Sequence, residues 1–313
     1  MSAHSEHFRI EEVAPGVWAA LAGPTGACVS NAGIIDLGDR TLVFDTFMTP
    51  QAGRDLREAA ERLTGRPAAL VVNSHHHDDH IRGNQAFGSA DIIGTVRMIE
   101  LIESGRPGDL DVYAEGVRAW IADLDRQLAD PEVPARNELA LSRRMAGEVL
   151  ASLPDLTITV PTSSFADELI VEGEARQAHL LSYGGGHTDS DAFVFLPDCG
   201  VLFAGDLLWV ESHPWGGDGH LDEWIDIVYR MNELRPRTVV PGHGTVAAFE
   251  YARVFSRYLT FLCDIVRQAE ASSMPVVKLA DHPIPPEYGG WDATRRFRTT
   301  LEALGRRAGL PAA

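Results

Sequence analysis

Imidazole and carboxylate groups are concentrated in one short stretch of this sequence. The segment Val71–Asn84 reads VVNSHHHDDHIRGN and holds four histidines and two aspartates within six consecutive residues. Imidazoles and carboxylates are the side chains that bind zinc and similar ions. In an extended chain residues two apart point the same way, so His75 and His77 can bind one ion. Asp79 and His80 follow just beyond the strand and can turn toward a second ion.

The alternative interpretation of this stretch is a solvated, histidine-rich surface turn. It fits poorly because the stretch directly follows the apolar run Leu70–Val72. Crowding imidazoles and carboxylates there without partners would be energetically costly. We therefore expect a metal site at this turn, with His76 pointing away from it.

The flanking sequence predicts the elements that position this turn. Gly33–Thr46 reads as strand, tight turn and strand, and Ala68–Val72 reads as a short buried strand. Between them we expect a helix with Thr49 as N-cap, Pro50 at its first position and Gly65 as its end. Later segments are predicted as strands at Leu156–Val160, Asp167–Gly173 and Arg237–Gly244, and as a helix over 222–234.

A weak internal repeat links two parts of the chain. Strand, turn and strand lead to Asp45 in one part and to Asp206 in the other. Each is followed by a helix and by a strand of the form V-V-x-x-H, which ends at His75 or at His243. Two similar halves would place both histidines at equivalent strand ends, where sites form in layered α/β folds.

Three further polar residues stand beside glycine in this second part. His187 follows three glycines, Asp206 follows Gly205 at an expected strand end, and His243 lies between two glycines. Glycine permits close backbone approach and unusual dihedral angles. A lone histidine is more often structural, but three such residues on connecting segments indicate a site.

These residues resemble a known family. The pattern H-x-H-x-D-H, with Asp45, His187, Asp206 and His243 in order, resembles the five motifs of the metallo-β-lactamase superfamily from about Gly33 to Gly244. The resemblance implies an α/β fold, a four-layer αββα sandwich, with a dinuclear metal site. We expect one such domain over 1–313, with a helical insertion at about 97–153 and a mostly helical tail at about 251–313.

The resemblance also implies a role for each ligand. Three histidines would hold the first metal: His75, His77 and His187. Three residues would hold the second metal: Asp79, His80 and His243. Asp206 would bridge both metals, and Asp45 would orient ligands from behind.

By the same resemblance the two metals share a water and lower its pKa, and the resulting hydroxide attacks a carbonyl. Asp79 is the candidate catalytic residue that orients the water and moves its proton. The expected function is a zinc-dependent hydrolase, with two zinc ions, acting on a carboxylic ester, thioester, lactone or β-lactam. The alternative is an iron-dependent persulfide dioxygenase-like redox enzyme on the same fold. Iron or manganese are the alternative metals, since these ligands do not fix the metal.

Departures from the family pattern narrow the range of expected superfamily branches and substrates. Aspartate at 206 resembles broad dinuclear hydrolases more than the lactamases proper. Asp191 stands where the glyoxalase II pattern has a second histidine, which argues against a glutathione thioester. Arg82 stands where many members have glycine, and we expect it to pair with a nearby carboxylate.

The loop Trp209–Trp224 follows the candidate bridging aspartate and is rich in aromatic residues. We expect four of its residues to line a substrate pocket: Trp209, His213, Trp215 and His220. The alternative is that the tryptophans belong to the core, since cores and pockets use the same aromatic side chains.

Composition limits the kinds of partner and the cellular location that we expect for this protein. The net charge of −18, from 45 acidic and 27 basic residues, opposes nucleic-acid binding. The start lacks the pattern of a signal peptide, and three scattered cysteines favour reduced thiols, so we expect a cytoplasmic protein without membrane contact. The expected partner is a small-molecule substrate. The helical insertion is interpreted as a lid or as the surface of a homodimer.

Overall fold

The computed structural model describes residues 5–23, 28–106 and 108–312. The first four residues, on which the expectation about a signal peptide partly rests, lie outside the described residues. The chain divides into two compact units. The first contains the described residues up to Phe165 together with Glu172–Arg176, and the second contains Ala166–Val171 and the residues from Gln177 on.

The first unit is built on a seven-stranded sheet whose strands follow chain order. They are β1 (Phe8–Ala14), β2 (Val17–Ala22), β3 (Ala32–Asp36), β4 (Thr41–Phe44), β5 (Ala68–Val72), β6 (Asp91–Thr95) and β7 (Ser163–Phe165). Strands β1 to β4 pair antiparallel, and β4 to β7 pair parallel. The predicted strand, turn and strand at Gly33–Thr46 are confirmed, with Gly38 at a φ of 98° in the turn.

Helix α1 (Pro50–Thr64) connects the parallel strands β4 and β5. It begins and ends as predicted. The Thr49 side chain accepts a hydrogen bond from the Ala52 N–H, and Gly65 adopts the left-handed conformation at the end. The buried face of the helix, which includes Leu56 and Ala59, belongs to the same apolar core as Val43 and Val71. This packing fixes the end of β5, from which the histidine-rich turn leaves.

The histidine-rich turn continues into the short helix α2 (Asp78–Ile81), and two glycines, Gly53 in α1 and Gly83 just after α2, bring α1 against the 3₁₀ turn Asn84–Phe87 that follows. A Cβ at Gly83 would overlap the Thr46 carbonyl oxygen and would lie 2.9 Å from the Cα of Gly53. No side chain fits in this space, so the close approach requires glycine.

We therefore expect Gly83→Ala to lower the free energy of unfolding by about 2 kcal/mol, because the backbone must move apart. Urea denaturation measures this. Gly88→Ala is the matched control, since a Cβ at Gly88 comes no closer than 4.0 Å to any atom. Equal stabilities of the two variants would contradict the steric explanation.

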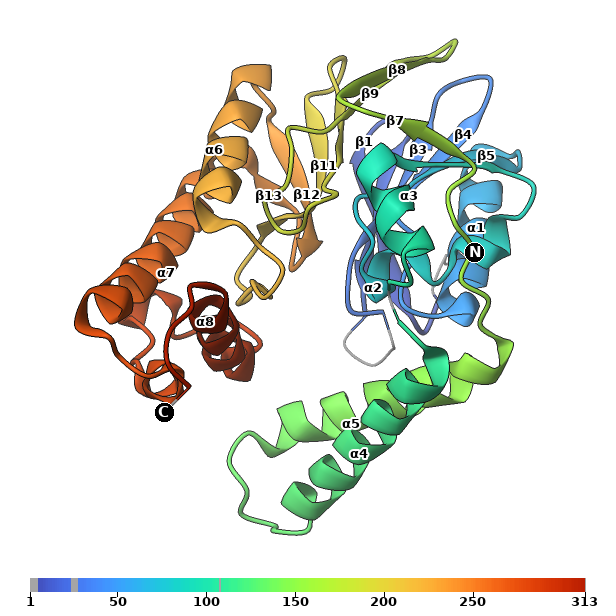
Figure 1. The fold of residues 1–313 in the computed structure, drawn as a ribbon. Helices are drawn as coiled ribbons and strands as arrows, with labels where there is room; N and C mark the ends of the chain where they lie inside the picture. Colours follow the sequence, from blue (N-terminus) through green and yellow to red (C-terminus); the bar gives the residue numbers. More distant parts are fainter. Residues whose placement is uncertain (1–4, 24–27, 107, 313) are drawn as a thin grey trace. The chain divides into compact units, whose positions relative to one another are not determined.

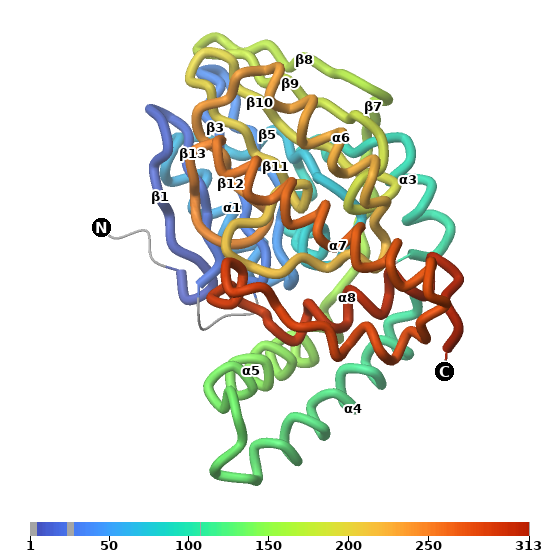
Figure 2. Tube along the Cα trace, turned by 90° about the vertical axis from the view of Figure 1, so that its left-hand side faces the viewer, coloured from blue at the N-terminus to red at the C-terminus, as the bar shows by residue number. Residues whose placement is uncertain are grey.

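The predicted helical insertion is confirmed as helical. It contains α3 (Val96–Glu103), α4 (Leu110–Leu128) and α5 (Arg136–Ser152). Helices α4 and α5 lie side by side as an antiparallel hairpin, seen in Figure 1 and again in Figure 2. Their shared core consists of Val117, Ala146 and Val149.

The strand predicted at Leu156–Val160 is wrong, and β7 begins only at Ser163. The Leu156 N–H donates to the Leu153 carbonyl, and side chains bond to two further backbone groups of this segment. The Thr157 N–H donates to the Gln85 side chain, and the Asn84 side chain donates to the Thr159 carbonyl. The apolar alternation that suggested a strand instead packs Ile158 and Val160 against a cluster around Ile81.

The second unit is built on a six-stranded sheet in the order β13-β12-β11-β10-β9-β8. The strands are β8 (Glu168–Glu172), β9 (Gln177–Leu181), β10 (Phe193–Leu196), β11 (Val201–Trp209), β12 (Thr238–His243) and β13 (Ala247–Ala248). Helix α6 (Leu221–Met231) lies in the connection between the parallel strands β11 and β12. This repeats the β4, α1, β5 arrangement of the first unit, as the internal sequence repeat predicts.

The C-terminal region is mostly helical, as predicted. Its helices are α7 (Ala252–Ser272) and α8 (Thr294–Arg307), and two 3₁₀ turns, Val276–Asp281 and Pro286–Tyr288, fall in the interval between them. Helices α6 and α7 cover β11 with an apolar core that includes Trp224 and Phe255 (Figure 1). Among the described helices none has both the length and the apolar character that a membrane span requires.

Candidate metal centre

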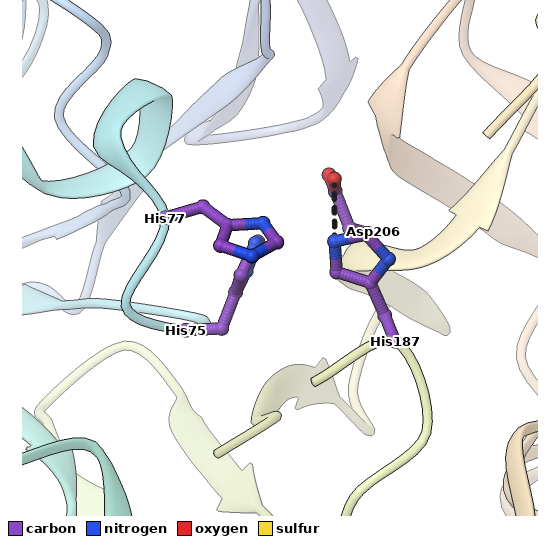
Figure 3. A group of neighbouring side chains, drawn as sticks. All are labelled: His75, His77, His187 and Asp206. Carbon is purple, nitrogen blue, oxygen red and sulfur yellow. Dashed lines mark ion pairs between the residues drawn. The ribbon is translucent and has the colours of Figure 1, made fainter. Parts of the chain in front are cut away.

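The histidine-rich turn of the first unit leads from β5 into α2. His77 is the N-cap of α2, so the chain changes direction between His75 and the Asp79–His80 pair. The rings of His75 and His77 lie 4.6 Å apart, and those of His75 and His80 lie 4.2 Å apart. Figure 3 shows His75 and His77 leaving this turn with their rings close together. His75 and His80 are buried, whereas the Asp79 side chain keeps 19% of its surface exposed.

Asp45 lies behind this turn, where sequence analysis expected a residue that orients ligands. Its backbone adopts a φ of 58°, an unusual conformation for a non-glycine residue. The His80 Nδ1–H donates to Asp45 Oδ2 over 2.7 Å. The Ser74 backbone N–H donates to Asp45 Oδ1 over 2.7 Å. Burial raises the pKa of Asp45, and the contacts with His80 and Ser74 oppose that shift.

Ser74 extends the influence of Asp45 to a second histidine, a role that sequence analysis missed. The Ser74 hydroxyl donates to Asp45 Oδ2 over 2.8 Å and lies 2.9 Å from His75 Nδ1. A hydroxyl has one proton to donate, so His75 Nδ1–H is the donor in the second contact. One buried carboxylate therefore fixes the tautomer of His80 directly and that of His75 through Ser74, and each Nε2 is the ring nitrogen suited to a metal.

Ser74→Ala is expected to weaken metal binding, measured with zinc as the probe, by roughly tenfold to a hundredfold, because His75 loses the group that fixes its tautomer. Competition with a chromophoric chelator measures the affinity. Ser152→Ala is the matched control, since that buried hydroxyl only donates to the Val149 carbonyl. Wild-type zinc affinity in the Ser74 variant would rule out the relay.

A buried amide network holds the backbone of the same turn, and it was also missed. Asn73 and Asn84 form reciprocal side-chain hydrogen bonds of 3.0 and 2.8 Å. The Thr46 backbone N–H and Asn73 Nδ2 both donate to the His80 carbonyl, over 2.9 and 3.2 Å. The two asparagines frame the quoted stretch, but only the fold shows that they meet.

Arg82 has the structural contact that its sequence context predicts. Its buried guanidinium lies 2.7 Å from the Asp78 carboxylate and 4.0 Å from the centre of the Tyr113 ring. Burial raises the pKa of Asp78 to about 6, against the opposing effect of Arg82. The arginine is thus part of the support of α2, with its charge engaged by a carboxylate and an aromatic face.

In the second unit Asp206 lies between two histidines. Its Oδ2 is 3.2 Å from His187 Nε2 and its Oδ1 is 3.3 Å from His243 Nε2, and all three side chains are buried. Figure 3 shows the His187–Asp206 ion pair. Each oxygen of this carboxylate thus faces one imidazole, so Asp206 is a candidate ligand together with both histidines.

Asp206 does not lie at a strand end, so that expectation is wrong. It lies inside β11, which continues to Trp209. The strand is irregular at Gly205, where φ is 51° and the pairing with β12 shifts register. His243 is the last residue of β12, as predicted. A Cβ at Gly242 would overlap Asp206 Oδ1, so this glycine makes room for the carboxylate.

Asp191 shapes the loop that carries His187. Its carboxylate accepts hydrogen bonds from the Gly186 N–H, the Thr188 N–H and the Thr188 hydroxyl, over 3.0, 2.9 and 2.7 Å. The residue that departs from the glyoxalase II pattern is therefore a buried anchor of the loop. The sequence shows that Asp191 stands four residues after His187. Its role as an anchor could not be predicted, because it depends on the loop folding back so that Asp191 reaches Gly186 and Thr188.

The four residues expected to line a pocket have different surroundings. Trp209 is buried, stacks on His243 with ring centres 3.7 Å apart and donates to the Asp206 carbonyl. His213 is also buried, and its Nδ1 lies 2.8 Å from the Tyr258 hydroxyl. Trp215 and His220 are partly exposed, and His220 Nε2 is 2.9 Å from the Asp189 carboxylate. A pocket role for these four residues stays a prediction.

Each unit thus combines a mixed sheet with helices, and histidine and aspartate side chains gather where its parallel strands end or bend. The protein is therefore of the α/β class and carries candidate metal ligands in both units. Residues 25–243 match the family model of the metallo-beta-lactamase superfamily. The match covers more than half of the chain, which therefore belongs to the metallo-β-lactamase superfamily. The expected family and fold class are confirmed.

Comparison with known proteins supports the fold. A metallo-beta-lactamase from Pontibacter korlensis superposes with a TM-score of 0.59 at 17% identity, covering 81% of this chain and 99% of the other. The metallo-beta-lactamase FIM-1 from Pseudomonas aeruginosa, in its mono-zinc form, gives 0.57 at 16% identity, covering 81% and 95%.

A curated relative, the linear primary-alkylsulfatase of a Pseudomonas species, is 22% identical over 231 residues, or 67% of this chain. The match spans only 40% of the length of that relative.

Proposed function

We propose that this protein is a metal-dependent hydrolase that binds two zinc ions. The observation that carries the proposal is the position of Asp206, whose two carboxylate oxygens each face one buried imidazole. Neutral imidazole and carboxylate are ligands of the kind that zinc prefers. The proposed ligands are the seven residues that match the family pattern: His75, His77, Asp79, His80, His187, Asp206 and His243.

The surrounding side chains fit such a role. Asp45 and Ser74 hold their histidines by Nδ1, which turns Nε2 outward as the donor atom. When bound, the metal ions supply Lewis acidity that polarises a substrate carbonyl and lowers the pKa of a water. Asp79 is the proposed proton carrier, because its carboxylate retains solvent exposure while the neighbouring His80 is buried.

The proposed substrates are carboxylic esters, thioesters, lactones and β-lactams. The alkylsulfatase relative adds alkyl sulfates to the compounds worth testing. We further propose a small-molecule substrate and a cytoplasmic location.

Metal content is the first test. Elemental analysis of the protein purified without added metal is expected to give about two zinc ions per chain. Hydrolysis of a panel of esters, thioesters, lactones, β-lactams and alkyl sulfates should then be abolished by chelation and restored by zinc. About one iron per chain, together with oxygen consumption in the presence of thiols or persulfides, would replace this proposal with the redox alternative.

A further inference from the structure

A cavity of about 250 Å³ lies in the first unit between α4, α5 and the loop after β4. Its walls are apolar except for one tyrosine hydroxyl. The lining residues are Met48, Tyr113, Gly116, Val117, Trp120, Met145, Ala146 and Val149. The antiparallel helices that form most of the lining are those of the hairpin in Figures 1 and 2.

Gly116 is the residue in this cavity that internal packing does not explain. It lies in the interior of the 19-residue helix α4, where glycine costs about 1 kcal/mol relative to alanine. A Cβ added there would have no other atom within 4 Å. Gly116 is exposed and lines the cavity, so the absence of a side chain there keeps the cavity open to solvent and accessible to a ligand.

The walls suit a flexible apolar ligand. Met48 and Met145 have unbranched, polarisable side chains that adapt to irregular shapes. Val117 and Val149 form a buried floor, whereas the Trp120 side chain is 40% exposed. A cavity with apolar walls and an exposed aromatic residue among its lining suits a hydrocarbon chain.

The cavity borders the turn that carries the proposed ligands. Tyr113, one of its lining residues, stacks on the Arg82 guanidinium, and Arg82 pairs with Asp78, the residue before Asp79. Met48 follows Asp45 by three residues. Within this compact unit, the contacts of Tyr113 with Arg82 and of Arg82 with Asp78 thus link the cavity to the residue that precedes Asp79.

We propose that this cavity binds the linear alkyl or acyl chain of the substrate, so that the enzyme prefers amphiphilic esters. The inference rests on the proposed function, because it assigns the substrate class of that site. In the reaction, water cleaves the bond between carbonyl carbon and ester oxygen, giving a carboxylic acid and an alcohol. The hydrocarbon chain belongs to one of these two products.

Chain-length kinetics test the inference and identify the source of the chain. One series is 4-nitrophenyl esters from acetyl to dodecanoyl, and the other is n-alkyl acetates from ethyl to dodecyl. In one series kcat/KM is expected to rise by roughly fourfold per methylene, because each buried methylene contributes about 0.8 kcal/mol, until the cavity is filled. A rise in the first series assigns an acyl chain, and a rise in the second assigns an alkyl chain.

Gly116→Leu adds a side chain to the cavity lining at a position where a Cβ meets no other atom within 4 Å, and Ala119→Leu places the same side chain on an exposed position of α4. The Gly116 variant should lose roughly a hundredfold in kcat/KM on the dodecyl or dodecanoyl substrate and nothing on the shortest one. The Ala119 variant should match the wild type on both. Circular dichroism verifies that both variants are folded.

Calorimetric titration with dodecanoate gives a readout that needs no hydrolysis. Binding weakened by Gly116→Leu and unchanged by Ala119→Leu supports the inference, even if no ester is cleaved and the proposed function fails. Hydrolysis without chain-length dependence, or equal dodecanoate binding by all three proteins, overturns the inference and leaves the hydrolase proposal intact. A change in oligomeric state confined to Gly116→Leu, with unchanged kinetics, would instead assign the cavity to a second copy of the chain.

Discussion

Replacing Asp206 with asparagine is expected to lower kcat by roughly a thousandfold and to reduce bound zinc from about two ions per chain to one or fewer. The amide keeps the shape of the side chain but has one neutral oxygen in place of two charged ones. A lost contribution of about 4 kcal/mol to transition-state stabilisation corresponds to this rate effect. Elemental analysis and steady-state kinetics on the best ester of the panel measure both quantities.

The matched control is Asp198→Asn, an exposed aspartate in the turn between β10 and β11 of the same sheet. It should keep wild-type zinc content and kinetics. Thermal unfolding of the metal-free proteins separates ligand loss from misfolding. Full zinc occupancy and near wild-type turnover in Asp206→Asn would contradict the assignment of Asp206 as the bridging ligand.

Local signals in the sequence predicted the elements that support the site. Thr49, Pro50 and Gly65 delimit α1 because capping and turn preferences act between residues close in sequence. The same is true of Gly38 in the turn between β3 and β4. The metal-ligand pattern was also readable, because His75 and the residues after it lie within one turn.

Contacts between distant segments could not be predicted in this way. Ser74 stands next to His75 in the sequence, but its relay depends on Asp45, 29 residues earlier. The segment Leu156–Val160 alternates like a strand, yet side chains from 70 or more residues earlier bond to two of its backbone groups. Asp206 looked like a strand end because it follows strand, turn and strand as Asp45 does, whereas β11 only shifts register at Gly205 and continues to Trp209.

The surroundings of the aromatic loop after β11 also depend on contacts between distant segments, so they could not be predicted from the sequence. His213 lies in an aromatic-rich loop that follows Asp206, and this composition suggested a substrate pocket. In the structure it is buried against side chains of the C-terminal region: Tyr258, Trp291 and Phe297. Such a partner set, 45 or more residues away along the chain, leaves no local signal.

This buried histidine makes stability depend on pH. Burial lowers the pKa of His213 from 6.5 to about 4, and the positive charge of Arg296 acts in the same direction. Between these two values the unfolded chain binds a proton at this position that the folded chain does not bind. The free energy of unfolding therefore falls as the pH drops through this window, and the contribution of His213 is complete only above a pH of about 6.5.

Lowering the pH from about 7 to about 4.5 should reduce the free energy of unfolding of the wild type by roughly 2.5 kcal/mol more than that of His213→Gln, because glutamine cannot titrate. Urea denaturation at both pH values measures the difference, with a chelator present so that metal release does not contribute. His179→Gln, which removes a partly exposed imidazole on β9, is the matched control. If both variants change the pH dependence equally, the buried His213 is not its source, because only burial among Tyr258, Trp291 and Phe297 distinguishes this imidazole from an exposed one.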